Sequence, residues 1–316
     1  MSVIEAESSQ HTHADSQSTL RIPTLRRYQN TVSKPVEFRG LSLFHGYDAT
    51  ARLIPAPANT GIVFRRTDLV DRPDIPATTD FLVREPRRTV LASTPDCRIE
   101  TTEHLMAALA GLQIDNVIVE VTCPELPAYD GSCRAFCDGI LDAGIEGQDH
   151  GAAIVQVDDV YTVRSSNRKQ TLTVRPYLFP CTAITYHFDY GVRSLVPPQQ
   201  LSVEITPAFF YHEISPARTF VLESEVSALK KLGYGKHLTT KDLVVIGQDG
   251  PIDNPLRWSD EGVRHKILDC VGDLALNGSG FYGHVTASRS GHELNHEMAK
   301  VLSMMGKSNS LLSKAA

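Results

Sequence analysis

The sequence has few of the features that mark membrane, secreted or nucleic-acid-binding proteins. No run approaches the roughly 18 apolar residues that a membrane-spanning helix requires. The N-terminal segment contains no basic stretch followed by an apolar one, so no secretory signal is predicted. The formal net charge of −6 argues against a nucleic-acid partner, because phosphate binding needs a basic surface. We therefore expect neither a transmembrane segment nor a nucleic-acid partner.

Cysteine is also scarce, and its spacing fits no disulfide framework or zinc knuckle. The chain has 6 cysteines, of which Cys133 and Cys137 lie close together without a second pair to complete a metal site. Reduced, mostly buried thiols are the usual state in a reducing compartment. The cysteines therefore predict a cytoplasmic protein without structural disulfides.

The composition is that of an ordinary globular protein. With 316 residues, 41% hydrophobic and 22% charged, the chain is long enough for two domains with sizeable cores. The polar segment over residues 1–28 is an exception, and we expect it to be a disordered tail.

The order of predicted elements divides the remainder into two halves. Residues 29–100 have the β-formers and turn residues of strands and hairpins, and helices follow over 101–112 and 134–145. The second half repeats this order, with strands first and helices later. We therefore predict an α+β fold of two similar domains, over residues 29–150 and 151–316.

One predicted helix, "EGVRHKILDCVGDL" at residues 261–274, carries an unusual polar face. His265, Asp269 and Asp273 are spaced by four residues, and such steps drift by only ~40° around a helix. An apolar stripe lies on the opposite side of the helix, formed by Val263, Ile267, Cys270 and Leu274. One interpretation is a surface helix with a solvated polar face. The other is a metal-bearing helix, because His and Asp at i, i+4 can bind one cation.

A candidate third ligand lies at the start of another predicted helix. A catalytic zinc site needs three protein ligands and one open position, and His104 follows Glu103 directly. The imidazole could bind the metal while the carboxylate takes a proton from water that the metal activates. Alternatively, the pair is an exposed Glu-His at a helix start, where the negative charge of Glu interacts favourably with the positive end of the helix dipole.

Two further residues have side chains that could take part in hydrolysis. His292 stands where a helix begins after a turn of small residues, and it could protonate a leaving group or simply belong to the first helical turn. Thr219, in "ARTF" at residues 217–220, could stabilise a developing oxyanion through its hydroxyl.

Several separated motifs together resemble one enzyme family. The chain contains, in this order, "TTEHLMAALAGLQIDNVIVEV", "ELPAYDGS", "ARTF", "VRHKILDCVGDL" and "SGHELN". This series is similar to that of the zinc-dependent UDP-3-O-acyl-N-acetylglucosamine deacetylases of lipid A synthesis. The segment "PAPANTGIVFRRTDL" near the start of the chain also resembles that family. The resemblance runs from about residue 28 to about residue 302. A set of separated motifs in fixed order is far more specific than a single pair of ligands.

The resemblance implies a metal centre and its proton-transfer groups. Zn2+ is the implied cofactor, with His104, His265 and Asp269 as its ligands. Glu103 matches the general base, and His292 matches the general acid.

The remaining matched residues support the chemistry or contact the substrate. Asp273 matches a carboxylate that orients His292, and Thr219 matches the hydroxyl that polarises the amide carbonyl. The residues expected to contact a UDP-linked, acylated glucosamine are Lys266, Phe220, Phe188 and Arg289. The implied activity is removal of the acetyl group from this small molecule.

The resemblance also implies an architecture, and the chain departs from the family pattern in places. Two α+β domains are expected, each with a sheet packed on helices, with the site in the cleft between them and the protein a monomer. His237 and Leu238 replace a usual glycine pair near the acyl-chain passage, Glu223 replaces an apolar residue, and Gly262 replaces an aromatic one. The accepted acyl-chain length is therefore open.

Two rival functions remain at this point. One is the same chemistry on a different acylated nucleotide sugar, and the other is a catalytically silent paralogue that retains zinc. A structural zinc would not need Glu103, His292, Thr219 and Lys266 beside it, which favours catalysis. The role of the tail and the replacement of zinc by iron are left open by the sequence.

Overall fold

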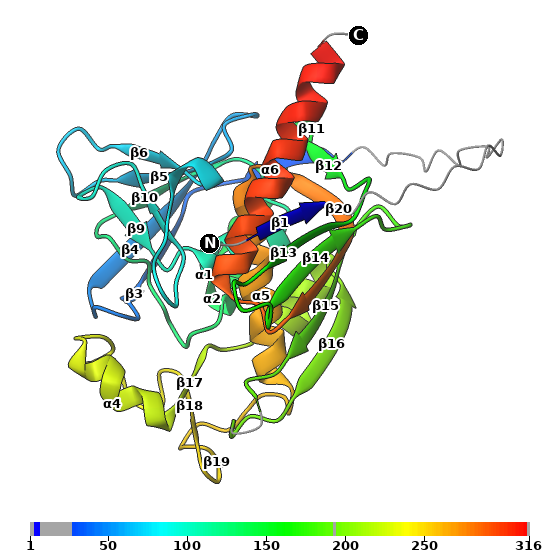
Figure 1. Cartoon of the computed structure of the whole chain (residues 1–316). Helices are drawn as coiled ribbons and strands as arrows, with labels where there is room; N and C mark the ends of the chain where they lie inside the picture. The colour runs from blue at the N-terminus through cyan, green and yellow to red at the C-terminus, as the bar shows by residue number, and fades with distance from the viewer. Residues whose placement is uncertain (1–2, 7–26, 192–193, 315–316) are drawn as a thin grey trace, which may run out of the picture.

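Two main sheets, with helices between them, organise the chain (Figure 1). The computed structural model describes residues 3–6, 27–191 and 194–314. One sheet is built from strands of the first half and the other mainly from strands of the second half. The predicted α+β class is therefore confirmed. Among the described residues, no helix combines the length and the apolar character needed to cross a bilayer.

The first half contains a five-stranded sheet in the order β3-β4-β10-β5-β6. Its strands are β3 (Val36–Leu41), β4 (Asp48–Pro55), β5 (Ile62–Arg66), β6 (Asp74–Pro76) and β10 (Val117–Val121). In β10, every second side chain is buried, as the two-residue period of a strand dictates. Two helices cover the sheet, α1 (Glu103–Gly111) and α2 (Arg134–Ala143), with α2 packed on β3 and α1 on α2.

Short strands complete the first half. Two of them, β2 (Tyr28–Val32) and β11 (Ile145–Gly151), form an antiparallel pair. Three others form a small antiparallel sheet, and they are β7 (Leu82–Val83), β8 (Val90–Ala92) and β9 (Arg98–Glu100). A 3-10 turn, η1 (Thr79–Phe81), precedes β7. The predicted helix over 134–145 ends at Ala143 because Gly144 adopts a positive φ of 82°.

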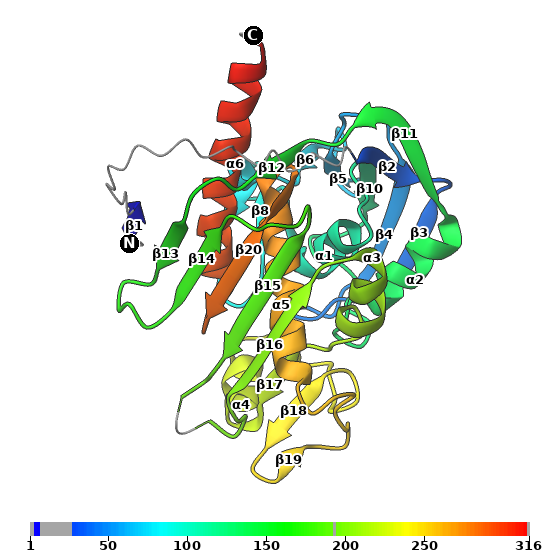
Figure 2. The same cartoon turned by 90° about the vertical axis from the view of Figure 1, so that its right-hand side faces the viewer.

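The second half contains a seven-stranded sheet in the order β1-β13-β14-β20-β15-β16, with β12 also paired to β20 (Figure 2). The strands are β1 (Val3–Ala6), β12 (Ile154–Gln156), β13 (Tyr161–Arg164), β14 (Thr171–Arg175), β15 (Thr182–Phe188), β16 (Gln199–Glu204) and β20 (Gly280–Ser288). The central strand β20 alternates buried and partly exposed side chains along its whole length. Its buried face therefore packs on helices.

Two helices and a short connection fill the space around this sheet. They are α5 (Glu261–Leu274), α6 (His292–Lys314) and the 3-10 turn η3 (Ala275–Asn277). Helix α5 packs on α1, on β15 and on α6, so it lies between the two halves (Figures 1 and 2). This central place explains why both of its faces are buried.

An insert and an irregular segment were only partly predicted. The insert comprises β17 (Phe220–Leu222), α4 (Glu223–Lys231), β18 (Val244–Gly247) and β19 (Gly250–Pro251), whose strands form a separate three-stranded sheet. The sequence predicted α4 and β18 in it. The helical turns α3 (Pro207–Phe209) and η2 (Phe210–Ile214) were not predicted.

The predicted disordered tail over residues 1–28 needs correction at its ends. Val3–Ala6 forms β1 and pairs antiparallel with β13, because an open sheet edge offers backbone hydrogen bonds that can order a short segment of a mostly polar tail. Arg27 is held by a bidentate ion pair with Asp115 at 2.7 Å, and β2 already begins at Tyr28. The rest of that prediction, residues 7–26, lies outside the described residues.

Candidate metal centre

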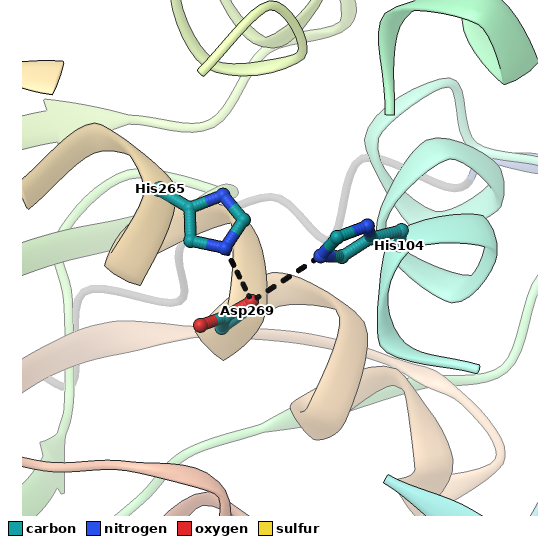
Figure 3. Close-up of side chains that lie close together, drawn as sticks. All are labelled: His104, His265 and Asp269. Carbon is teal, nitrogen blue, oxygen red and sulfur yellow. Dashed lines mark ion pairs between the residues drawn. The ribbon is translucent and has the colours of Figure 1, made fainter. Parts of the chain in front are cut away.

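Close packing of α1 on α5 brings together side chains from the two halves of the chain. At the crossing, a Cβ placed on Gly272 would lie 2.1 Å from the carbonyl oxygen of Glu103, so only glycine permits this approach. His104, in the first turn of α1, consequently faces His265 and Asp269 on α5 (Figure 3).

The three predicted ligands form a compact, buried cluster. The Oδ1 atom of Asp269 lies 3.4 Å from Nε2 of His265 and 3.9 Å from Nε2 of His104 (Figure 3). All three potential ligand atoms lie within 4.8 Å of one another. Their residues are only 2–5% exposed, so the interpretation of α5 as a surface helix with a solvated polar face is wrong. The predicted apolar stripe on its other side is buried as well.

The donor set fits a zinc ion. Ligand atoms at 2.0–2.1 Å from a tetrahedral zinc lie roughly 3.3 Å apart, close to the spacing in this cluster. The Nδ1 atom of His265 lies 3.1 Å from the carbonyl oxygen of Ala217, to which it donates, so its Nε2 lone pair is directed at the cluster. Lys266 donates to Oδ2 of Asp269 at 2.9 Å and leaves Oδ1 to face the imidazoles.

The protonation states of the cluster also suit a cation. Burial, together with the charge of His265, lowers the pKa of His104 to about 3. Burial also lowers the pKa of His265. For Asp269, burial raises the pKa, but His265 and Lys266 outweigh it and hold the pKa well below its usual range. Two neutral imidazoles and one carboxylate are the forms that metal binding requires.

Two proton-transfer candidates stand beside the cluster. Glu103 is 3% exposed, and its Oε2 accepts the backbone N–H of Thr89 at 3.0 Å. Burial raises the pKa of Glu103 to about 8, against the opposing charge of His292. His292 donates from Nδ1 to Oδ2 of the fully buried Asp273 at 2.8 Å. Burial lowers the pKa of His292, but the charge and hydrogen bond of Asp273 outweigh it and raise the pKa to about 9.

A buried ion pair fixes the segment that carries Thr219. Arg218 binds Glu261, in the first turn of α5, through Nε–Oε1 and Nη2–Oε2 contacts of 2.8 and 3.0 Å. The carbonyl of Ala217 in the same segment holds His265. Partly buried Thr219 is thereby tied to the helix that carries two of the metal ligands.

Three of the four predicted substrate-contact residues line a neighbouring cavity of about 390 Å³. They are Lys266, Phe188 and Arg289. Phe188 is only 2% exposed, and its ring packs edge-on against Phe220 with centroids 5.8 Å apart. Arg289 donates from Nε to Asp189 at 3.1 Å. Phe220 therefore belongs to this region through its contact with Phe188.

Gly262 makes room for this arrangement. A Cβ at Gly262 would lie 3.3 Å from the Cζ atom of Phe188 and 3.3 Å from the side-chain oxygen of Gln199. Gln199 in turn accepts the backbone N–H of Val263 at 3.0 Å. An aromatic side chain in place of Gly262 would have to displace Phe188 or Gln199.

The sequence did not identify several residues of the site. Asn295 and His296 follow His292 at i+3 and i+4, and this helical spacing was a usable signal. Asn295 donates to Oδ2 of Asp273 at 2.9 Å. Thr89 and the Arg218–Glu261 pair have no local sequence signal, because only long-range contacts of the fold bring them to the site. The residues that sequence reasoning missed are Thr89, Arg218, Glu261, Asn295 and His296.

Comparison with known proteins identifies the family of the chain. The family model described as UDP-3-O-acyl N-acetylglycosamine deacetylase (LpxC) matches residues 29–304. A protein of Myxococcus xanthus (strain DK1622), named UDP-3-O-acyl-N-acetylglucosamine deacetylase, is 37% identical over 275 residues, which cover 86% of this chain and 85% of the relative. With a family match over most of its length and a relative that is 37% identical over most of both chains, the chain belongs to the UDP-3-O-acyl N-acetylglycosamine deacetylase family.

Proposed function

We propose that this enzyme hydrolyses the acetamide of UDP-3-O-(3-hydroxyacyl)-N-acetylglucosamine and releases acetate, as a step of lipid A biosynthesis. The observation that carries the proposal is the buried cluster of His104, His265 and Asp269. Glu103 and His292 lie close enough for their charges to interact with Asp269 of that cluster. The name of the relative from M. xanthus supports the choice of substrate.

Zinc is the proposed cofactor, and His104, His265 and Asp269 are the residues that would hold it. Nitrogen and carboxylate donors at this spacing favour zinc over the oxygen-binding cations. When bound, zinc supplies Lewis acidity, which polarises the amide carbonyl and makes the attacking water more acidic.

The protein's own side chains move the protons. Glu103 takes a proton from the attacking water as the new C–O bond forms, with Oε2 anchored by Thr89. As the C–N bond breaks, His292 gives a proton to the departing amine from Nε2, because Nδ1 is engaged by Asp273. The hydroxyl of Thr219 donates to the oxyanion. The products are acetate and the free amine.

The cavity beside the cluster is the proposed place of the nucleotide part. Lys266 and Arg289 supply positive charge at its wall, which suits a diphosphate, and Phe188 supplies an aromatic edge. We infer a monomer that acts on a small molecule in the cytoplasm. All six cysteines are free, as expected in a reducing compartment.

The insert is where a difference in acyl-chain preference is expected. His237 packs against the turn at Gly46, where a Cβ would lie 2.6 Å from the imidazole Nδ1. The backbone N–H of Gly235 donates to the carbonyl of Phe44 at 2.8 Å. These contacts tie the region that departs from the family pattern to the first half of the chain.

Acetate release from substrates of graded acyl length tests the proposal. Zinc-loaded wild-type enzyme should release one acetate per substrate, and Glu103→Gln with the same zinc content should not. A wild-type protein that binds zinc and releases no acetate from any of these substrates would favour a catalytically silent zinc protein instead.

A further inference from the structure

Thr89 contacts both proton-transfer groups of the site. It lies directly before β8 and is fully buried. Its backbone N–H donates to Oε2 of Glu103 at 3.0 Å, and its hydroxyl donates to Oδ1 of Asp273 at 2.5 Å. Asp273 in turn binds His292 through its other oxygen at 2.8 Å. One residue thus bridges the proposed base and the partner of the proposed acid.

The single hydroxyl proton of Thr89 fixes the direction of a hydrogen-bond chain. An ionised carboxylate only accepts, so the hydroxyl must donate to Asp273. The Nε2 atom of His296 lies 2.8 Å from the same hydroxyl oxygen and must therefore be the donor in that contact. The chain runs from His296 through Thr89 to Asp273, and His292 donates to the other oxygen of the same carboxylate.

A metal ion is the competing explanation for these side chains. Asp273, His292 and His296 have ligand-type atoms within 4.8 Å of one another, and "HELNH" at 292–296 has the spacing of a metal-binding helix. However, Oδ1 of Asp273 and Nε2 of His296, which lie 3.4 Å apart, are both within hydrogen-bonding distance of the hydroxyl of Thr89, at 2.5 and 2.8 Å. Asn295 and His292 both direct N–H groups at the other carboxylate oxygen. This second cluster is therefore a hydrogen-bond network.

Building on the proposed function, we propose that Thr89 is a positioning residue for proton transfer. It fixes Glu103 through its backbone N–H and the Asp273–His292 pair through its hydroxyl. Because Thr89 is 0% exposed, it does not touch the substrate. Loss of its hydroxyl should therefore slow turnover and leave substrate binding nearly unchanged.

The test compares Thr89→Val, which removes the hydroxyl at nearly constant volume, with Thr89→Ser, which retains it. Thr89→Ala removes the hydroxyl without a new methyl contact, in case the valine variant does not fold. Thr31→Val is the matched control, since Thr31 is 4% exposed and its hydroxyl accepts a backbone N–H from Ala56, away from the metal ligands. Zinc content is measured for every variant.

We expect kcat of Thr89→Val to fall about 10–100-fold, the usual effect of removing an outer-shell partner, with zinc retained and KM nearly unchanged. Thr89→Ser should recover most of the turnover, and Thr31→Val should behave as wild type. The account of Thr89 is overturned if Thr89→Val turns over normally, or if Thr89→Ser is as slow as Thr89→Val.

A spectroscopic readout separates this inference from the proposed function. The Nδ1 proton of His292, identified by its loss in His292→Ala, should give a downfield proton resonance because it is donated to a buried carboxylate. Thr89→Val should shift this resonance, and Thr89→Ser and Thr31→Val should not. An unchanged resonance in Thr89→Val contradicts the role of Thr89, whereas a wild-type protein that releases no acetate contradicts only the proposed function.

Discussion

Helix α5 takes part in two clusters that look alike by composition and differ in chemistry. The first joins Asp269 to His104 and His265, and the second joins Asp273 to two histidines of α6. In the first, Oδ1 of Asp269 faces two imidazole nitrogens at 3.4 and 3.9 Å, which suits a shared cation. In the second, Asp273 accepts hydrogen bonds from three side chains.

The difference shows that residue type and proximity do not identify a metal site. The deciding feature is whether the lone pairs of the carboxylate are already used. Asp269 gives Oδ2 to Lys266 and keeps Oδ1 for the cluster, whereas both oxygens of Asp273 are occupied by donors. We therefore assign metal binding to the first cluster and control of a proton to the second.

The largest expected effect is loss of the metal from the first cluster. His265→Ala should reduce bound zinc well below one per chain and abolish turnover, because two protein ligands rarely hold zinc firmly. His284→Ala is a suitable control, since His284 lies on β20 and contacts Arg175 at 2.9 Å. Elemental analysis of both proteins measures the effect, and full zinc occupancy in His265→Ala would remove that residue from the ligand set.

A somewhat smaller effect is expected for Glu103, whose charge interacts with members of both clusters. Glu103→Gln should retain zinc and lose turnover by a factor of roughly 10² or more, the scale of general acid–base catalysis. Glu293→Gln controls for the loss of a carboxylate, since Glu293 is exposed and pairs with Arg84. Steady-state acetate release measures both variants. Normal turnover by Glu103→Gln would show that another group is the base.

Asp273→Ala should slow turnover about 10–100-fold without loss of zinc. Its pH profile should also change. If His292 acts as the proposed acid, its protonated form is required, so activity should fall as the pH rises through its pKa of about 9. Without Asp273, burial remains and lowers that pKa, so the basic limb should move to lower pH. Asp68→Ala, which removes a partner of Arg66, is the control. A pH–rate profile that superimposes on wild type would leave His292 without its partner.

The smallest effect is expected at the outer end of the second cluster. His296→Gln retains an N–H donor for the hydroxyl of Thr89, so turnover should fall by less than about tenfold, the scale of one hydrogen bond. Zinc content should be that of wild type. Loss of zinc in His296→Gln would indicate that the second cluster binds metal after all.

The sequence predicted the parts of the site that depend on local spacing or on motif order. His265 and Asp269 were found from their four-residue separation on a helix, and His104 with Glu103 from its place at a helix start. The burial of α5 on both faces could not be predicted, because it depends on α1 packing against it at Gly272. Helical periodicity does not reveal which neighbours cover a polar face.

Contacts between distant segments account for the rest of what was missed. Thr89 reaches Asp273 across 184 positions of sequence, and Arg218 reaches Glu261 across 43, so no local pattern indicates either contact. Strand β1 was missed for a related reason, since its order comes from pairing with β13. Polar composition predicts disorder only where no sheet edge offers backbone partners.

Zinc content in a matched pair of variants tests the distinction between the clusters most directly. Asp269→Asn and Asp273→Asn make the same chemical change one helical turn apart on α5, at two residues that are each at most 3% exposed. Elemental analysis after purification with excess zinc should find about one zinc per chain in wild type and in Asp273→Asn, and much less in Asp269→Asn. Zinc loss in Asp273→Asn with retention in Asp269→Asn would contradict the assignment.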